Sequence, residues 1–120
     1  MLYNKAMDTY SALADPTRRQ ILELLARDGP ISATAIVEHF PLTASAISQH
    51  LKVLREAHLV HMDKHAQQRI YRVNPDALLE LEDWARRLGQ LLKARFDAFE
   101  KVLEAEKKQL ELNDSEREQQ

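Results

Sequence analysis

The stretch TASAISQHLKVLREAHLV, residues 43–60, contains the pattern that decides the fold. Thr43 is predicted to cap a helix that continues to about Ala57, because its hydroxyl can accept a hydrogen bond from the first helical turn. Ile47, Leu51 and Leu54 follow one another at i, i+4 and i+7, which gives this helix a narrow apolar seam. The remaining face holds only small, polar or basic side chains, namely Ala44, Ser45, Ser48, Gln49, Lys52 and Arg55. The helix is therefore expected to pack against the domain by its apolar side and to leave the other side exposed.

Further helices are expected upstream of this segment. They are predicted over about Leu2–Leu13, Thr17–Asp28 and Ala33–His39. Asp15 and Pro16 have the composition of an N-cap and a first helical position, since proline needs no amide hydrogen there. Ser32 is the corresponding cap of the third helix. Four helices therefore precede residue 58, and the third and fourth are separated only by a short turn.

Downstream, the hydrophobic period changes from helical to alternating. Two strands, Leu59–Lys64 and Arg69–Val73, are predicted around a polar tip at residues 65–68. Asn74-Pro75 opens a long helix over residues 76–112, and residues 113–120 are expected to form a frayed polar tail. This order predicts a mostly helical α+β fold, a winged helix-turn-helix. Its DNA-binding domain would cover residues 1–75, and its long C-terminal dimerisation helix residues 76–112.

This arrangement indicates a DNA-binding surface. In a helix-turn-helix the second helix enters the major groove, which is about 12 Å wide and admits one helix. A hairpin beside it can contact an adjacent groove or the backbone. The residues predicted to contact DNA are Arg18, Arg19, Thr43, Ala44, Ser45, Ser48, Gln49, Lys52, Arg55, Lys64, Gln67, Gln68 and Arg69. A solvated helix start explains Arg18 and Arg19 equally well, and periodicity alone also fits a surface helix of an all-α domain.

The composition fits one ordinary globular domain, with 120 residues, 44% hydrophobic and 30% charged. The net charge of −2 divides into +2 over residues 1–75 and −4 over residues 76–120, so the predicted DNA-binding half is the basic one. Cysteine is absent, which excludes disulfides and thiolate metal sites. No segment has the pattern of a signal peptide or the length of a membrane span, so a cytoplasmic protein is expected.

The long helix carries a stripe of large apolar side chains over several turns. So small a chain offers too few partners to cover this stripe, so it is predicted to form the interface of a homodimer. The residues predicted at this interface are Trp84, Leu88, Leu91, Leu92, Phe96 and Phe99. The alternative is a ligand pocket lined by Trp84 and the phenylalanines.

Three segments strongly resemble the ArsR-type winged-helix repressors. They are ALADPTRRQILELL (12–25), ASAISQHLKVLREAHLV (44–60) and RIYRVNP (69–75). The resemblance implies a dimer, with the first and last helices at its interface, that binds an inverted repeat and represses transcription. It also implies that Ser45, Ser48 and Gln49 read bases and that the hairpin is the wing.

The departures from the family concern regulation. Metal-sensing members carry cysteines in the third helix, where this chain has SATAIVEHF, or Asp, His and Glu ligands in the final helix, which has no histidine here. The chain looks more like the non-metal branch found beside genes for hydrophobic-ligand-binding proteins of the heat-shock-ATPase-activator superfamily. No metal or other cofactor is therefore expected, and the sequence identifies no inducer.

Other functions stay open as alternatives. His61 and His65, with Asp63 between them, would chelate a metal if the hairpin brought them together, as in a metal-responsive repressor with histidine and carboxylate ligands; exposed wing residues explain them equally well. A protein-interaction module that never touches DNA would carry an apolar or acidic face on residues 43–57. An enzyme is disfavoured, because no phosphate loop, nucleophile elbow or cysteine nucleophile is present. For His50, beside the apolar seam, a hydrogen-bonded packing role is predicted.

Overall fold

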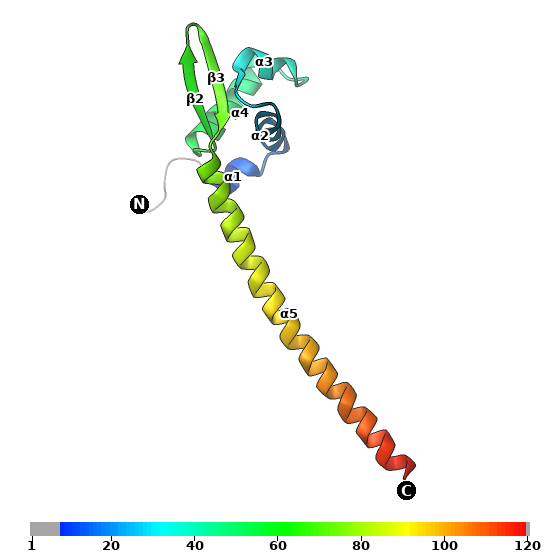
Figure 1. Cartoon of the computed structure of the whole chain (residues 1–120). Coiled ribbons are helices and arrows are strands. Elements are labelled where there is room, and N and C mark those ends of the chain that lie inside the picture. Colours follow the sequence, from blue (N-terminus) through cyan, green and yellow to red (C-terminus); the bar gives the residue numbers. More distant parts are fainter. Residues whose placement is uncertain (1–7, 120) are drawn as a thin grey trace, which may run out of the picture. The chain divides into compact units, whose positions relative to one another are not determined.

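A computed structural model describes residues 8–119, and it confirms the mostly helical winged helix-turn-helix fold (Figure 1). Two compact units divide within the last helix, between Glu80 and Leu81. The elements follow in the order α1 (Thr9–Leu13), α2 (Pro16–Asp28), β1 (Ile31–Ser32), α3 (Ala33–Glu38), α4 (Ala44–Glu56), β2 (Val60–His65), β3 (Gln68–Val73) and α5 (Pro75–Glu118).

The predicted N-caps of three helices are confirmed. Asp15, Ser32 and Thr43 each accept a hydrogen bond from the backbone amide three residues later, at 3.0, 3.2 and 3.0 Å. Each cap satisfies an amide that the helix itself leaves without a partner. Helix α4 therefore begins where its local sequence predicts.

Helix α1 is described over Thr9–Leu13 and is capped by Asp8, whose Oδ1 accepts a hydrogen bond from Ser11 N at 2.8 Å. The helix expected over about Leu2–Leu13 thus falls partly on residues 2–7, which lie outside the described residues.

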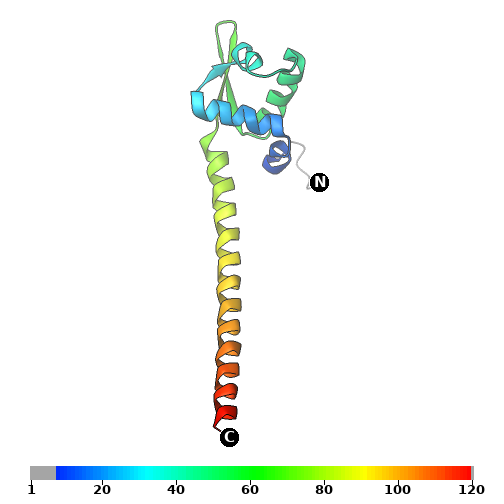
Figure 2. The ribbon, with the colours of Figure 1, turned by 90° about the vertical axis from the view of Figure 1, so that its right-hand side faces the viewer.

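The sheet has three antiparallel strands in the order β1-β3-β2, and Figure 2 shows β1 beside the hairpin. The two strands of the hairpin were predicted, but β1 was not. Its two residues, Ile31 and Ser32, pair with Tyr71 and Ile70. A strand of two residues is too short to show an alternating pattern, so only its partner in the folded chain defines it.

The hydrophobic core lies in the first unit. Its fully buried side chains include Ile47, Leu51 and Leu54, which form the predicted inner seam of α4. These pack with residues of α2, α3 and the hairpin, including Ile21, Leu25, Ile36, Leu59, Val60 and Tyr71. Burial of one face of α4 leaves its opposite face at the surface, as the sequence predicts.

Helix α4 ends in a Schellman motif, in which two amides beyond the helix bond back to its last carbonyls. His58 N donates to Arg55 O and Leu59 N donates to Leu54 O, both at 3.0 Å. This closure requires His58 to adopt a left-handed backbone conformation, with φ of 60°. The motif directs the chain from the helix into β2, and so sets where the hairpin begins.

Helix α5 has 44 residues, and none of those described is buried. It reaches Glu118, past residue 112, where the sequence analysis placed its end. Salt bridges at helical spacing, Glu82–Arg86 and Asp83–Arg87, lie along its surface. Among the described helices, none combines the length and the apolar character needed to cross a bilayer.

Candidate nucleic-acid interface

The outer face of α4 is exposed over its whole length. The predicted base-reading residues Ser45, Ser48 and Gln49 lie at the surface, as do Thr43 and Ala44. Because the hydroxyl of Thr43 accepts the Ala46 amide, its first role is to hold the start of the helix. Small side chains at this end allow the helix backbone to approach another surface closely, while the serine and glutamine side chains supply donors and acceptors.

A groove of about 460 Å³ joins α4 to the wing strand β3. Lys52 and Arg55 line it from α4, and Arg69 lines it from β3. None of these three cations has a salt bridge within residues 8–119. The rest of the lining is Ser48, Glu56 and Tyr71. The structure thus gathers basic residues from two elements around one open groove, which suits an anionic backbone.

A second groove, of about 250 Å³, lies beside the first and is mostly apolar. Ser48, Arg69 and Tyr71 line both grooves, while Thr34 and Val37 contribute from α3. The sequence did not predict Thr34 and Tyr71 among the residues that line these grooves. In the sequence, Tyr71 is an ordinary strand residue of the alternating segment RIYRV. Only the pairing of β3 between two other strands places its ring at the floor of these grooves.

The hairpin places the other predicted wing residues at its exposed end. His65 pairs with Gln68, so that Ala66 and Gln67 form the turn, and Ala66 has a positive φ of 57°. Lys64 lies opposite Arg69 in the ladder. Two like charges directly opposite each other destabilise a strand pair. An anion bound between them would remove this cost.

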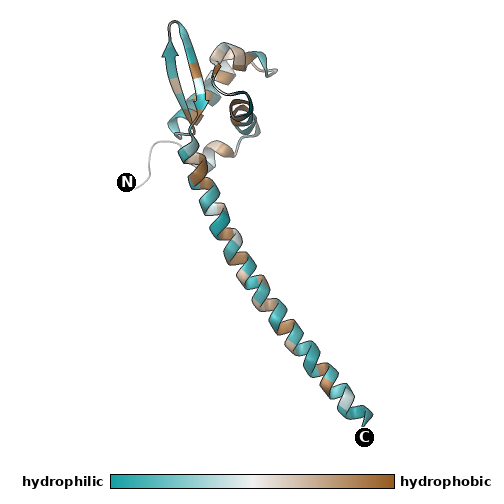
Figure 3. Ribbon diagram, in the orientation of Figure 1, coloured by the Kyte–Doolittle hydropathy of each residue, from teal (hydrophilic) through white to brown (hydrophobic). Residues whose placement is uncertain are grey.

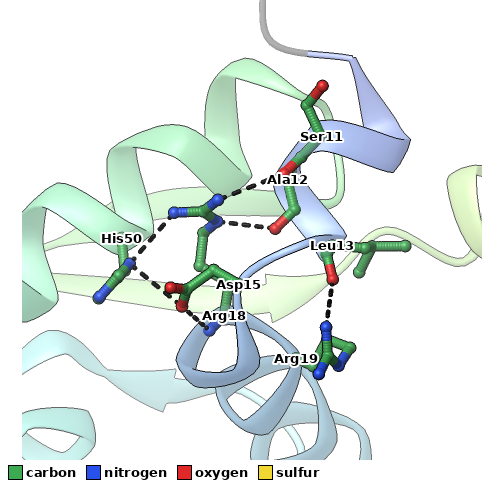
Figure 4. Close-up of polar contacts among 7 residues, drawn as sticks. All are labelled: Ser11, Ala12, Leu13, Asp15, Arg18, Arg19 and His50. Carbon is green, nitrogen blue, oxygen red and sulfur yellow. Dashed lines mark hydrogen bonds and ion pairs between the residues drawn. The ribbon is translucent and has the colours of Figure 1, made fainter.

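Arg18 and Arg19 do not line either groove. Figure 4 shows that both side chains instead contact carbonyls of α1. Arg18 Nε donates to Ala12 O and Arg19 Nη1 donates to Leu13 O, each at 2.7 Å. Both guanidinium groups, which were predicted to contact phosphate, therefore already have partners within the chain.

The histidines do not gather into a metal site in the part of the chain that the structure describes. No group of three His, Cys, Asp or Glu side chains is placed there as a metal ion would require. Asp63, between His61 and His65, instead pairs with Arg72 at 3.1 Å.

The pKa of Asp15 is lowered because the Arg18 amide donates to its carboxylate, and the Ser11 amide similarly lowers the pKa of Asp8.

The apolar stripe of α5 is exposed, and Figure 3 shows apolar and polar residues alternating along this helix. The exposed fractions of Leu91 and Phe96 are 70% and 63%. Other exposed large apolar residues of the helix are Leu79, Trp84, Leu88, Leu92, Phe99, Val102, Leu103, Leu110 and Leu112. Many of them recur at intervals of eleven residues, as in Leu88, Phe99 and Leu110. Eleven residues make nearly three whole turns, so the stripe stays on one side of the helix.

Comparison with known proteins agrees with this architecture. Residues 13–63 match a family model described as a helix-turn-helix domain. The transcriptional repressor SdpR of Bacillus subtilis is 35% identical over 77 residues, 64% of this chain and 84% of that protein. The HTH-type transcriptional regulator Rv2034 of Mycobacterium tuberculosis is 37% identical over 103 residues, 79% of this chain and 95% of that protein.

Solved structures give the same result. An ArsR-like transcriptional regulator from Rhodococcus sp. RHA1 superimposes with a TM-score of 0.67 at 29% identity, over 78% of this chain and 87% of that one. The homodimeric winged helix-turn-helix DNA-binding domain Mb0332 from Mycobacterium bovis has a TM-score of 0.55 at 27% identity, over 68% of this chain and 74% of that one. The fold and the surface thus define a winged helix-turn-helix transcription factor. The chain belongs to the ArsR family of transcriptional regulators.

Proposed function

We propose that this chain is a homodimeric repressor that binds an inverted-repeat DNA operator and occludes a promoter. The observation that carries the proposal is the groove in which Lys52 and Arg55 of α4 meet Arg69 of β3. It lies beside the exposed face of α4 that bears Ser45, Ser48 and Gln49. A face of hydrogen-bonding side chains, bordered by cations that have no salt bridge within residues 8–119, matches the combination of base edges and phosphates in a major groove.

Each side chain has a role in this proposal. Ser45, Ser48 and Gln49 read base edges, and the small side chain of Ala44 allows close approach. Lys52, Arg55 and Arg69 bind phosphates from the groove. Lys64, Gln67 and Gln68 extend the contact from the wing, where the pairing of Lys64 with Arg69 favours an anion between them. Thr43 positions the helix start, and no catalytic step is assigned to any residue.

Dimerisation completes the operator-binding unit. The stripe on α5 presents nine exposed large apolar side chains between Trp84 and Leu110, far more than a water-exposed surface of this size usually carries. Burial against the same stripe of a second chain gains about 25 cal/mol per Å² of apolar surface removed from water. A two-fold dimer matches an inverted repeat, whose half-sites lie about 34 Å apart on one face of the duplex. The homodimeric state of the related Mycobacterium bovis domain supports this assembly.

Repression is proposed from the relatives. The related Bacillus subtilis protein is a transcriptional repressor, and a winged domain that binds across a promoter represses by blocking access to it. The proposed site of action is the cytoplasm, the compartment in which a bacterial repressor such as the Bacillus subtilis relative meets its DNA. The outer face of α4 disfavours the rival protein-interaction module, since it presents polar and basic residues rather than an apolar or acidic face.

Selection of duplexes from a randomised pool by the full-length protein tests the proposal. We expect enrichment of an inverted repeat with half-sites one helical turn apart, and affinity that falls steeply with salt. A pool that does not enrich any sequence, or binding that does not depend on salt, would contradict it.

A further inference from the structure

Arg18 connects the end of α1 with the recognition helix α4 (Figure 4). Its Nε donates to Ala12 O at 2.7 Å and its Nη2 donates to Ser11 O at 3.3 Å. Carbonyls in the last turn of a helix need partners from outside the regular ladder, and Arg18 is such a partner. Its third nitrogen, Nη1, lies 3.4 Å from His50 Nδ1. All three nitrogens of this half-buried side chain therefore have a partner within the chain.

His50 receives this contact on α4. It lies between the exposed Gln49 and the buried Leu51, and its side chain is 21% exposed. A guanidinium group only donates hydrogen bonds, so Nδ1 of His50 has to be the acceptor. This confirms the hydrogen-bonded role predicted for His50, and places it on the flank of the helix whose outer face carries Gln49.

Asp15 completes the cluster from the N-terminus of α2. Its Oδ2 accepts the hydrogen bond of Arg18 N at 3.0 Å and lies 3.8 Å from His50 Nδ1. Three segments are thus joined at one point: the last turn of α1, the first turn of α2 and the flank of α4 (Figure 4). A shift of α4 relative to α1 would force Arg18 to give up its contacts with one of the two helices.

We propose that Arg18 is a positioning residue for DNA recognition, which acts through His50 to hold the recognition helix and contacts no phosphate. This inference rests on the proposed function, and it replaces the sequence-based expectation that Arg18 binds DNA. A guanidinium group that reached a phosphate would have to leave three partners in two helices. In its observed place it keeps the face of Ser45, Ser48 and Gln49 in a fixed orientation, which base readout requires.

Two kinds of substitution at Arg18 separate positioning from phosphate binding. Arg18→Lys keeps the charge but cannot contact all three acceptors at once. Arg18→Gln removes the charge. The probes are the duplex selected by the wild-type protein and a scrambled duplex of the same composition. We expect Arg18→Lys to lower affinity for the selected duplex about tenfold, the effect of one charged hydrogen bond, and Arg18→Gln to leave the salt slope unchanged.

Substitutions at His50 test the same contact from α4. His50→Leu removes the acceptor and should also cost about tenfold, whereas His50→Asn keeps an acceptor oxygen near Nδ1 and should bind like the wild type. The double variant Arg18→Lys/His50→Leu should bind no more weakly than either single variant, because each removes one shared contact. Arg19→Lys is the matched control, since within residues 8–119 the Arg19 side chain hydrogen-bonds to Leu13 O of α1 and not to α4.

The outcomes distinguish this proposal from the proposed function. If the wild type does not prefer the selected duplex, both fall. If it does prefer that duplex, wild-type affinity in Arg18→Lys overturns the positioning role and leaves the proposed function standing. A salt slope reduced by about one in Arg18→Gln has the same consequence. Additive losses in the double variant would show that Arg18 does not act through His50. Circular dichroism establishes which variants fold. If Arg18→Lys does not fold, the two His50 variants decide whether Arg18 has a positioning role.

Discussion

Gln49 and Lys52 lie three residues apart on the exposed face of α4, yet they suit different parts of a DNA duplex. The amide of Gln49 has a donor and an acceptor side by side, which matches the edge of adenine in the major groove. The ammonium of Lys52 is a point charge at the edge of the cationic groove, which matches a phosphate. One side chain can therefore carry sequence information, while the other can carry affinity.

Replacement of these two residues should separate specificity from affinity. Gln49→Ala should cost about 1–3 kcal/mol on the selected duplex and little on a scrambled one. Lys52→Gln should weaken binding to both duplexes alike and reduce the salt slope by about one. Titration of both duplexes at several salt concentrations provides the measurement. Equal losses on the two duplexes for Gln49→Ala would remove it from the base-reading residues.

His58 has a left-handed backbone conformation, which is unfavourable for a residue that carries a side chain. The Schellman motif requires φ of 60° at this position, which costs an L-residue about 1–2 kcal/mol relative to glycine. The side chain is exposed and takes no part in the core. His58→Gly should therefore raise the free energy of unfolding by about 1 kcal/mol, after allowance for the greater freedom of glycine in the unfolded chain.

Urea unfolding at one fixed protein concentration measures this change, since dimerisation makes stability depend on concentration. His58→Ala is the control, because alanine has a Cβ and should show no such gain. A gain of equal size in His58→Ala would mean that loss of the imidazole, rather than relief at φ, explains the result.

At the scale of elements, one cross-strand pair of the hairpin, Lys64 with Arg69, affects both the stability of the free protein and its binding to DNA. Lys64 lies opposite Arg69, and like charges in such a pair cost about 0.2–1 kcal/mol. Lys64→Gln should therefore stabilise the free protein slightly while weakening its binding to DNA and reducing the salt slope by about one. Thermal unfolding and DNA titration of the same preparation test both halves. Lys64→Arg, which keeps the charge, should leave both properties near wild type; a loss of stability in Lys64→Gln would contradict the prediction.

The elements that could be predicted from the sequence are those with local signatures. Asp15, Ser32 and Thr43 mark helix starts because a cap needs only the next three residues. Ile47, Leu51 and Leu54 identify the buried face of α4 because helical periodicity is local too. Strand β1 could not be predicted, since its two residues become a strand only through pairing with β3, far along the chain.

The candidate site shows the same limit. Composition and periodicity suffice to find the exposed polar face of α4, but the position of Arg69 in a groove with Lys52 and Arg55 depends on how the hairpin packs against that helix. Arg18 is the clearest case. From the sequence it is a cation at a helix start, and only the fold brings it to His50, which is 32 residues away.

At the scale of the whole molecule, function depends on how two chains are joined. One recognition helix contacts only a few base pairs, so a single chain gains little specificity. In the proposed dimer, two chains joined by α5 would bind two half-sites, and the second binding step would become intramolecular, which raises affinity by about 10²–10⁴ without any new contact. The exposed stripe of α5 would then contribute to DNA binding although none of its residues touches DNA.

Phe96→Glu should produce a monomer and lower affinity for the selected duplex by about 10²–10⁴, because a charge placed in the stripe cannot be buried against a second copy without a large desolvation cost. Leu88→Glu should act alike. Gln90→Glu adds the same charge two residues from Leu88, about 200° around the helix, and should remain dimeric. Sedimentation velocity and DNA titration provide the measurements. A Phe96→Glu protein that is monomeric yet binds with full affinity would break the link between dimerisation and DNA binding. One that remains dimeric would place the interface outside α5, with α1 as the next candidate.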